Sequence, residues 1–173
     1  IDGDNRRGGL HRLVGATRMP GLMEVLSGTA SMEEAAQRTP YPLLDLLPCG
    51  KRLQTGPELL GSPAMAELLE QAKATYSLVL IDCPPLGAGV DPFVLGIAAQ
   101  NIMLVLRTGQ TDREFAEAKL SVLDRLPVRI MGAVLNGVPA GGAYRYYGYL
   151  PGYEAADEQI TPRPRETALP VSG

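Results

Sequence analysis

Residues 76–85 read Tyr-Ser-Leu-Val-Leu-Ile-Asp-Cys-Pro-Pro, and the four apolar side chains of 78–81 lead directly to Asp82. A run in which apolar residues do not alternate with polar ones is typical of a parallel strand that is buried on both faces. Two prolines follow, and they cannot continue a central strand. The stretch therefore predicts a buried strand with one carboxylate at its carboxyl end.

Three other near-continuous apolar runs have the length of a strand. They are Leu43 to Leu47, Ile102 to Leu106 and Ile130 to Leu135. Segments with the period of a helix separate these runs, and strands that alternate with helices in this way usually form a parallel sheet. We therefore expect an α/β fold, with a doubly wound, mainly parallel sheet and flanking helices.

Helix starts are marked by capping residues, whose side chains accept hydrogen bonds from the first free backbone N–H groups. The starts are Ser31 with Glu34 ahead of residues 32–38, Ser62 with Pro63 ahead of a helix to about Thr75, and Thr111 with Glu114 ahead of a helix that Pro127 closes. Each of these segments is therefore predicted to be a helix that packs on the sheet.

The composition excludes several classes of protein. The 173 residues fit one domain, and a net charge of −3 provides no basic field for nucleic acid. The most apolar stretch, Val94 to Leu106, is shorter than the ~20 residues that span a bilayer.

One histidine, His11, cannot form a multi-histidine zinc site and is predicted at the surface or as a cap. Cys49 and Cys83 are predicted to be buried apolar residues.

Carboxylates follow two of the expected strands. Asp2 and Asp4 come directly after Ile1, which we interpret as a strand end, and Asp82 ends the run of 78–81. Ligands of a parallel sheet bind beyond the carboxyl ends of its strands, and Mg²⁺ is usually held by one or two carboxylates with waters and phosphates. The same residues could instead only cap the segments that follow. Taken together, they favour phosphoryl chemistry.

The phosphate-binding loop that normally accompanies such carboxylates is missing. The pattern G-x-x-x-x-G-K-[ST] does not occur in the 173 residues. Either the protein does not use a nucleotide, or its loop lies upstream of Ile1. Because the chain opens at the end of an expected strand, we favour the second interpretation.

Tyrosines gather near the end of the chain. Five of the seven lie within ten residues, at Tyr144, Tyr146, Tyr147, Tyr149 and Tyr153. Residues 140–173 lack apolar periodicity and are predicted to be a flexible tail behind a domain of residues 1–139. The cluster could be a segment that docks a partner, or a set of phosphoacceptors. Five phosphates would add about −7.5 to −10 charges, enough to push subunits apart.

These motifs together resemble the bacterial tyrosine kinases of capsule and exopolysaccharide synthesis. The matching segments are residues 1–7 with 10–13 (Walker A′), 58–62, 76–85 (Walker B) with Asp91, 132–138, and the tyrosine cluster. The resemblance covers about residues 1–153. It implies a P-loop NTPase domain of the MinD/ParA-like type, from which the first strand and its Walker A loop are missing.

The resemblance also implies a function and its residues. The domain would use ATP and Mg²⁺ to phosphorylate its own terminal tyrosines and so regulate polysaccharide polymerisation and export. Asp82 and Asp4 would position Mg²⁺, Asp2 would be the base that deprotonates a tyrosine, and Asn136 would contact the adenine. Without the upstream loop, the chain alone is expected to be inactive.

Partners follow from the same resemblance. Family members form a ring in which the tail of one subunit enters the site of its neighbour. The ring docks on a membrane-bound polysaccharide co-polymerase that activates it, so the expected location is the cytoplasmic face of the bacterial plasma membrane. A cognate tyrosine phosphatase is also expected, and nucleic acid is not.

The chain departs from the family pattern in places. Thr55-Gly56 stands where members often have Asn-Pro, and 20 residues follow Tyr153, near which many members end. Two alternatives remain open. One is a MinD/ParA-like ATPase, which would have no use for the tyrosines, and the other is a non-catalytic regulatory remnant that acts only as a phosphoacceptor.

Overall fold

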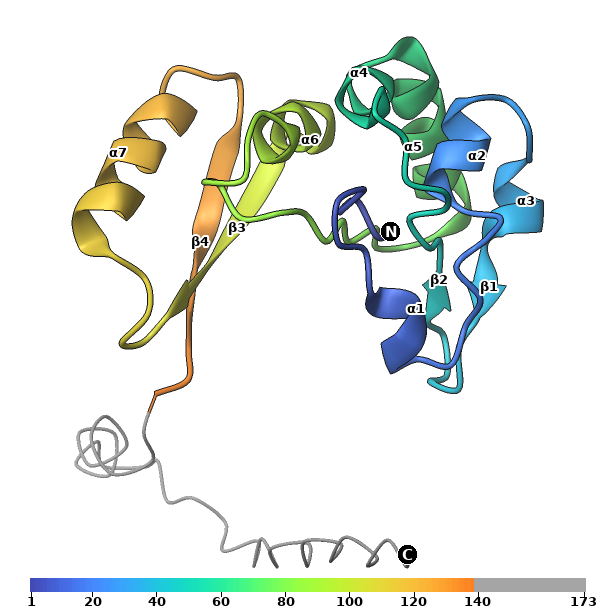
Figure 1. Ribbon diagram of the computed structural model, residues 1–173, viewed down its shortest axis with the longest axis horizontal. Coiled ribbons are helices and arrows are strands. Elements are labelled where there is room, and N and C mark those ends of the chain that lie inside the picture. Colours follow the sequence, from blue (N-terminus) through green and yellow to red (C-terminus); the bar gives the residue numbers. More distant parts are fainter. Residues whose placement is uncertain (139–173) are drawn as a thin grey trace, which may run out of the picture. The chain divides into compact units, whose positions relative to one another are not determined.

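The computed structural model describes residues 1–138, and the predicted tail with its five tyrosines lies outside them. The first structural unit comprises Ile1–Asn136. Its helices are α1 (Leu10–Leu13), α2 (Leu22–Leu26), α3 (Met32–Ala35), α4 (Gly56–Leu60), α5 (Pro63–Thr75), α6 (Asp91–Ala99) and α7 (Arg113–Leu123), and its strands are β1 (Gln37–Arg38), β2 (Asp45–Leu46), β3 (Asn101–Arg107) and β4 (Arg129–Asn136) (Figure 1).

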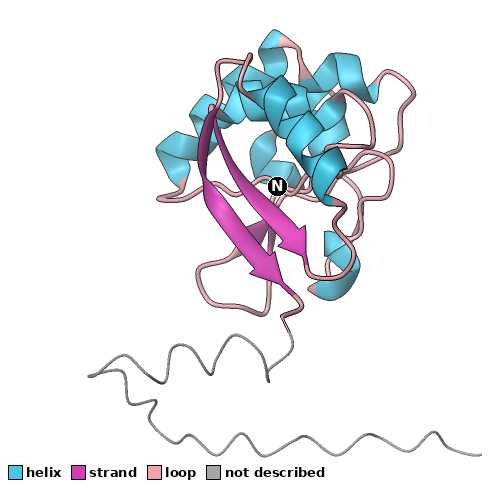
Figure 2. Ribbon diagram, turned by 90° about the vertical axis from the view of Figure 1, so that its left-hand side faces the viewer, coloured by secondary structure: helices cyan, strands magenta, loops and turns pink. Residues whose placement is uncertain are grey.

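The strands β3 and β4 form the longest ladder of the described residues. They run parallel, with Val105 opposite Val134 and an irregularity between Ile102 and Met103, and they lie side by side in Figure 2. The helix α7 connects them, as the crossover of a parallel pair requires. The runs 102–106 and 130–135 are therefore confirmed as parallel strands.

Residues 1–3 lie between two other extended segments. Asp2 N–H donates to the carbonyl of Leu47 at 2.8 Å on one side. On the other side, Asp82 N–H donates to the carbonyl of Ile1 at 2.9 Å, and Gly3 N–H donates to the carbonyl of Asp82 at 2.8 Å. These bonds make a parallel bridge between Asp2 and Asp82, so the ends of the two predicted strands do lie together.

The prediction of a strand over 77–81 is wrong at the level of regular secondary structure, although the segment is extended. Only one edge of it is paired: within residues 1–138, the backbone groups of Val79 and Ile81 have no hydrogen-bond partner. Val79 and Ile81 pack against the core, whereas Leu78 and Leu80 are 71% and 69% exposed. A strand paired along only three residues does not form a regular ladder.

The predicted parallel strand over 43–47 is also wrong. Only Asp45 and Leu46 form a strand, and it pairs antiparallel with β1. Leu43 adopts a φ of 64° and is fully exposed, because it lies in the turn that joins the two strands. Thr39 closes this turn, since its hydroxyl donates to the carbonyl of Leu44 at 2.8 Å.

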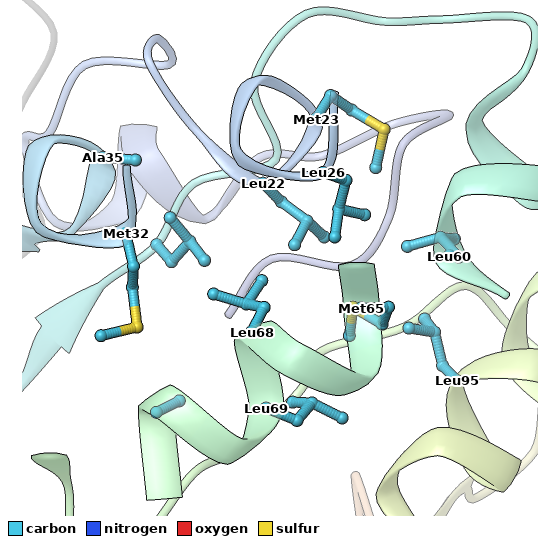
Figure 3. Close-up of a cluster of buried hydrophobic side chains, with 12 residues drawn as sticks. Leu22, Met23, Leu26, Met32, Ala35, Leu60, Met65, Leu68, Leu69 and Leu95 are labelled. Atoms are coloured by element: carbon cyan, nitrogen blue, oxygen red, sulfur yellow. The ribbon is translucent and has the colours of Figure 1, made fainter. Parts of the chain in front are cut away.

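The main core packs on α5. Met65, Leu68, Leu69 and Ala72 recur at the spacing that places side chains on one face of a helix, and all four are buried. Figure 3 shows this face meeting side chains of α2, α3, α4 and α6, which are Leu22, Met23, Leu26, Met32, Ala35, Leu60 and Leu95. Burying each large side chain contributes about 1.5–3 kcal/mol. The prediction of this helix to Thr75 is confirmed.

The other two capping predictions have different outcomes. Ser31 and Glu34 form the expected reciprocal box, but α3 ends at Ala35 rather than at residue 38. The box at Thr111 is wrong: the cap of α7 is Asp112, whose Oδ1 accepts from Phe115 N–H at 2.7 Å. Thr111 instead accepts from Arg107 N–H through its hydroxyl.

The helix α6 contacts both the extended residues around Gly3 and the strand β3. Leu95 is buried in the main core and also reaches Gly3, where an added Cβ would come within 2.9 Å of the leucine Cδ1. One residue further on, a Cβ at Gly96 would come within 2.5 Å of Cδ1 of Ile102 on β3. Side chains are excluded at both glycines, and this lets α6 pack closely on both segments. None of the helices within residues 1–138 is long and apolar enough to cross a bilayer.

Candidate functional site

The turn that follows residue 1 is built around the buried carboxylate of Asp2. This residue is 0% exposed, and each of its two oxygens accepts from a backbone N–H: Oδ1 from Asp4 at 3.3 Å and Oδ2 from Leu10 at 3.2 Å. Asp2 thus holds the start of α1 against the strand end from which it projects.

Asp4 forms the next part of the same turn. Its Oδ1 accepts from the N–H groups of Arg6 at 2.9 Å and Arg7 at 2.8 Å, and its carbonyl accepts from Gly8 N–H at 2.7 Å. Its Oδ2 has no hydrogen-bond partner within residues 1–138. Because Asp4 is only half-buried, this oxygen can accept a ligand.

Asp82 completes a group of three carboxyls. Partial burial, and after it the negative charges of Asp2 and Asp4, raises the pKa of the Asp82 carboxyl, and the terminal ammonium group of Ile1 opposes this rise. A cation bound beside Asp82 would remove the repulsion, because it would interact favourably with all three carboxylates. The three aspartates chosen from the sequence are therefore neighbours in the structure.

The residues present fit a magnesium ion better than a metal that needs a full protein cage. In the described part of the chain, no group of three or more His, Cys, Asp or Glu side chains could hold a metal by itself. Mg²⁺ needs only one or two carboxylates, since waters and substrate phosphates fill its other positions. Asp4 Oδ2 and the carboxylate oxygens of the exposed Asp82 are available to bind such an ion.

An ion pair that the sequence did not reveal lies beside this group. Arg6 donates from Nε to Asp91 Oδ2 at 2.9 Å and from Nη2 to Asp91 Oδ1 at 3.4 Å. Asp91 is 1% exposed and begins α6. The sequence offered Asp91 only as a residue at the usual distance after Asp82, because no local spacing rule connects it with Arg6.

A cavity of about 470 Å³ opens beside the turn. Its lining is Asn5, Arg6, Arg52, Leu53, Gln54, Pro57 and Asp91. Asn5 closes one wall, because its amide donates to the carbonyl of Leu53 at 2.8 Å and accepts from Leu53 N–H at 3.3 Å. Gly56 lies so close to the Asn5 amide that a Cβ at residue 56 would overlap with it. This accounts for the glycine in Thr55-Gly56, the pair that stands where family members often have Asn-Pro.

The remaining candidate residues have different positions. Asn136 is exposed at the carboxyl end of β4, where its carbonyl accepts from Thr108 N–H at 2.9 Å, and its contact with adenine stays a prediction. Tyr144, Tyr146, Tyr147, Tyr149 and Tyr153 lie outside the described residues.

Two predictions about reactive side chains need correction. His11 is not at the surface: it is buried in α1, and its Nδ1 has no partner within residues 1–138. Cys83, which follows the bridge residue Asp82, is exposed. The prediction that Cys49 is buried is confirmed.

Comparison with known proteins gives consistent relatives. The chain is 34% identical to EpsB of Ralstonia nicotianae over 172 residues, which covers 91% of the chain and 23% of the relative. It is 33% identical to the tyrosine-protein kinase Wzc of Salmonella typhimurium (86% and 21%) and 35% identical to the tyrosine-protein kinase YwqD of Bacillus subtilis (86% and 63%). The chain thus spans less than two thirds of each of these relatives. No protein-family model matches it.

Solved structures agree with the sequence relatives. The kinase domain of the Escherichia coli tyrosine kinase ETK superposes with a TM-score of 0.77 at 33% identity, covering 83% of this chain and 56% of that one. The BceF tyrosine kinase domain has a TM-score of 0.73 at 36% identity, covering 80% and 55%. MinD of Pyrococcus horikoshii, at 24% identity and a TM-score of 0.60 (78% and 55%), shares the fold alone. The predicted fold class, a parallel sheet with flanking helices of the P-loop NTPase type, is confirmed.

Proposed function

We propose that this chain, which belongs to the bacterial tyrosine kinase family, is the part of an ATP-dependent protein-tyrosine autokinase that carries the metal-binding carboxylates and the acceptor tyrosines. The observation that carries the proposal is the parallel bridge between Asp2 and Asp82, which brings the Asp2–Asp4 turn to the end of the 78–81 segment. Two acidic motifs far apart in the sequence thereby become neighbours, which supports one shared site.

Asp4 Oδ2 and Asp82 would hold Mg²⁺, which would neutralise charge on the phosphates of ATP when bound. In the reaction, a tyrosine oxygen attacks the γ-phosphorus, the bond to the bridging oxygen of ADP breaks, and the tyrosine proton passes to a carboxylate. We propose Asp2 as this base and Asn136 as the adenine contact. Because Asp2 is 0% exposed and its carboxylate is held by backbone N–H groups, its turn would have to open for a tyrosine to reach it.

The site needs a further segment. Among residues 1–138, nothing pairs with the edge formed by Val79 and Ile81. Four apolar side chains are more than half exposed, Leu78 and Leu80 in the same extended segment and Met103 and Val105 on β3. A strand would pair with the edge, and a helix would cover the apolar side chains. A strand, a phosphate-binding loop and a helix occur in this order in P-loop proteins. We therefore propose that such a unit, outside these 173 residues, completes the kinase, and that the chain alone does not transfer phosphate.

The biological setting is part of the same proposal. The acceptors would be the five clustered tyrosines, and a tail would enter the site of a neighbouring subunit in a ring. The ring would act at the cytoplasmic face of the membrane with a polysaccharide co-polymerase, a cognate phosphatase would reverse the modification, and phosphorylation would regulate capsule or exopolysaccharide export. The family relationship supports this setting.

The test uses the chain extended upstream through a phosphate-binding loop, incubated with Mg·ATP and analysed by mass spectrometry. We expect phosphate on residues 144–153 in the parent and none in Asp82→Asn. The matched control is Asp124→Asn, which changes an exposed carboxylate at the end of α7 and should retain the label. ATP hydrolysis without tyrosine label would indicate a MinD/ParA-like ATPase. Label that appears only after an intact kinase is added would indicate a regulatory remnant.

A further inference from the structure

Asp91 is a buried carboxylate whose charge is matched by one side chain. At 1% exposure it receives Nε of Arg6 on one oxygen and Nη2 on the other, and it lies at the first position of α6. A helix N-terminus favours an acidic residue by itself, so its position alone would explain an aspartate there. It would not explain why an arginine from the turn of Asp2 and Asp4 approaches it in a fork.

The loop before α6 is shaped to admit this arginine. Gly89 has a φ of +130°, and a Cβ there would come within 2.9 Å of Arg6 Nη2. A side chain at residue 89 would therefore push the guanidinium away from Asp91. Gly89 thus leaves room for the guanidinium of Arg6, whose side chain is 45% exposed while that of Asp91 is 1% exposed.

Arg6 is also joined to the candidate metal ligand. Its backbone N–H donates to Asp4 Oδ1 at 2.9 Å, which leaves Oδ2 as the oxygen for a cation. The orientation of the Asp4 carboxylate thus depends on the backbone N–H groups of Arg6 and Arg7, and the side chain of Arg6 is paired with Asp91. The connection runs from α6 through Arg6 to Asp4.

We propose that Asp91 is a positioning residue of the metal site: through Arg6 it fixes the Asp4 turn so that Asp4 and Asp82 can share one divalent cation. The proposal rests on the metal site of the proposed function. Groups that orient metal ligands typically change metal affinity by about 10- to 100-fold when they are removed. Asp91 itself would not touch the metal, the nucleotide or the tyrosine.

The experiment measures Mn²⁺ binding to the upstream-extended chain by electron paramagnetic resonance, so it does not depend on phosphorylation. We expect Asp82→Asn to abolish the tight site and Asp91→Asn to weaken it by about 10-fold or more. Arg6→Lys keeps the charge but loses the fork, so it should fall between the parent and Asp91→Asn. The control for general destabilisation is Asp112→Ala, which removes the cap of α7 and should leave Mn²⁺ affinity unchanged.

Thermal unfolding of each variant separates positioning from stability. If Asp91→Asn lowers the melting temperature but binds Mn²⁺ as tightly as the parent, the proposal is overturned and Asp91 only stabilises α6. It is equally overturned if the parent has no Mn²⁺ site that depends on Asp82. If the binding series is as expected but no tyrosine is labelled with Mg·ATP, only the proposed kinase function fails.

Discussion

Asp2 and Asp82 form a parallel bridge, and their carboxyl groups are neighbours although most of the first unit separates them in sequence. The carboxylate of Asp2 is engaged by backbone groups, while that of Asp82 accepts no hydrogen bond from residues 1–138 and has its pKa raised by its partial burial and its acidic neighbours. In this structure Asp2 therefore maintains the turn, so its proposed role as the base needs this turn to open, whereas Asp82 is available to a ligand.

Replacing Asp2 should destabilise the fold more than replacing Asp4. In Asp2→Asn, the amide NH₂ would face a backbone N–H that now donates to a carboxylate oxygen, leaving a buried donor unpaired at a cost of about 1–3 kcal/mol. Asp4→Asn can keep its carbonyl oxygen toward Arg6 and Arg7, since its other oxygen is free. Urea unfolding of the two variants measures the difference, and equal losses would contradict the assigned tasks.

The cap of α7 gives a second prediction. Asp112→Ala should lower the free energy of unfolding by about 1 kcal/mol, because it removes the acceptor for Phe115 N–H. Glu114→Ala, which the sequence pattern would make the partner in a capping box, should change it by less than about 0.5 kcal/mol. Urea denaturation checks both, and a reversed order would restore Thr111 and Glu114 as the capping pair.

Local patterns predicted the elements that local interactions decide. The helix α5 combines Ser62, Pro63 and a clear apolar face. The strands β3 and β4 pair with each other through their backbone groups. The segment 77–81 has an equally strong pattern but did not become a regular strand, because a ladder needs partners on its edges. The neighbouring carboxylates were predictable from strand ends, whereas the pairing of Arg6 with Asp91 depends on tertiary structure.

The open edge yields a prediction that distinguishes two forms of the protein. In the 173-residue chain, Leu80→Lys should change the free energy of unfolding by less than about 0.5 kcal/mol, because the side chain is 69% exposed. In the upstream-extended chain the same change should cost more than about 2 kcal/mol, since the added helix would bury this side chain. Gln71→Lys, at an exposed position of α5, is the control and should be neutral in both. Equal small effects of Leu80→Lys would argue against the added segment.

Tyr76 predicts how stability changes at alkaline pH. Burial, and then its hydrogen bond to Asp45 at 3.0 Å, raises the pKa of the Tyr76 phenol above 10.0. A raised pKa means that the folded state holds the proton more tightly, so this contribution is complete below the pKa of the unfolded chain and is lost as pH rises through the folded pKa. Tyr76→Phe should therefore flatten the loss of stability above about pH 10. Urea unfolding between pH 8 and 11 measures this, because the range runs from about two units below to about one unit above the ordinary pKa of a tyrosine. An unchanged slope would exclude this pair as a source of the pH dependence.

Cys83 can report on the charge of the site. Cys83 is exposed as a residue, but partial desolvation of its thiol, and then the charges of Asp82 and Asp4, raises the pKa of that thiol, so less thiolate is present near neutral pH than in a free cysteine. In native protein, Cys83 should react with a disulfide reagent before the buried Cys49, but more slowly than free cysteine. Asp82→Asn removes one negative charge and should accelerate the reaction. Mg²⁺ should have the same effect on the parent and little effect on the variant, because the cation would neutralise the same carboxylate. A rate that is insensitive to both changes would show that the cation does not bind next to Asp82.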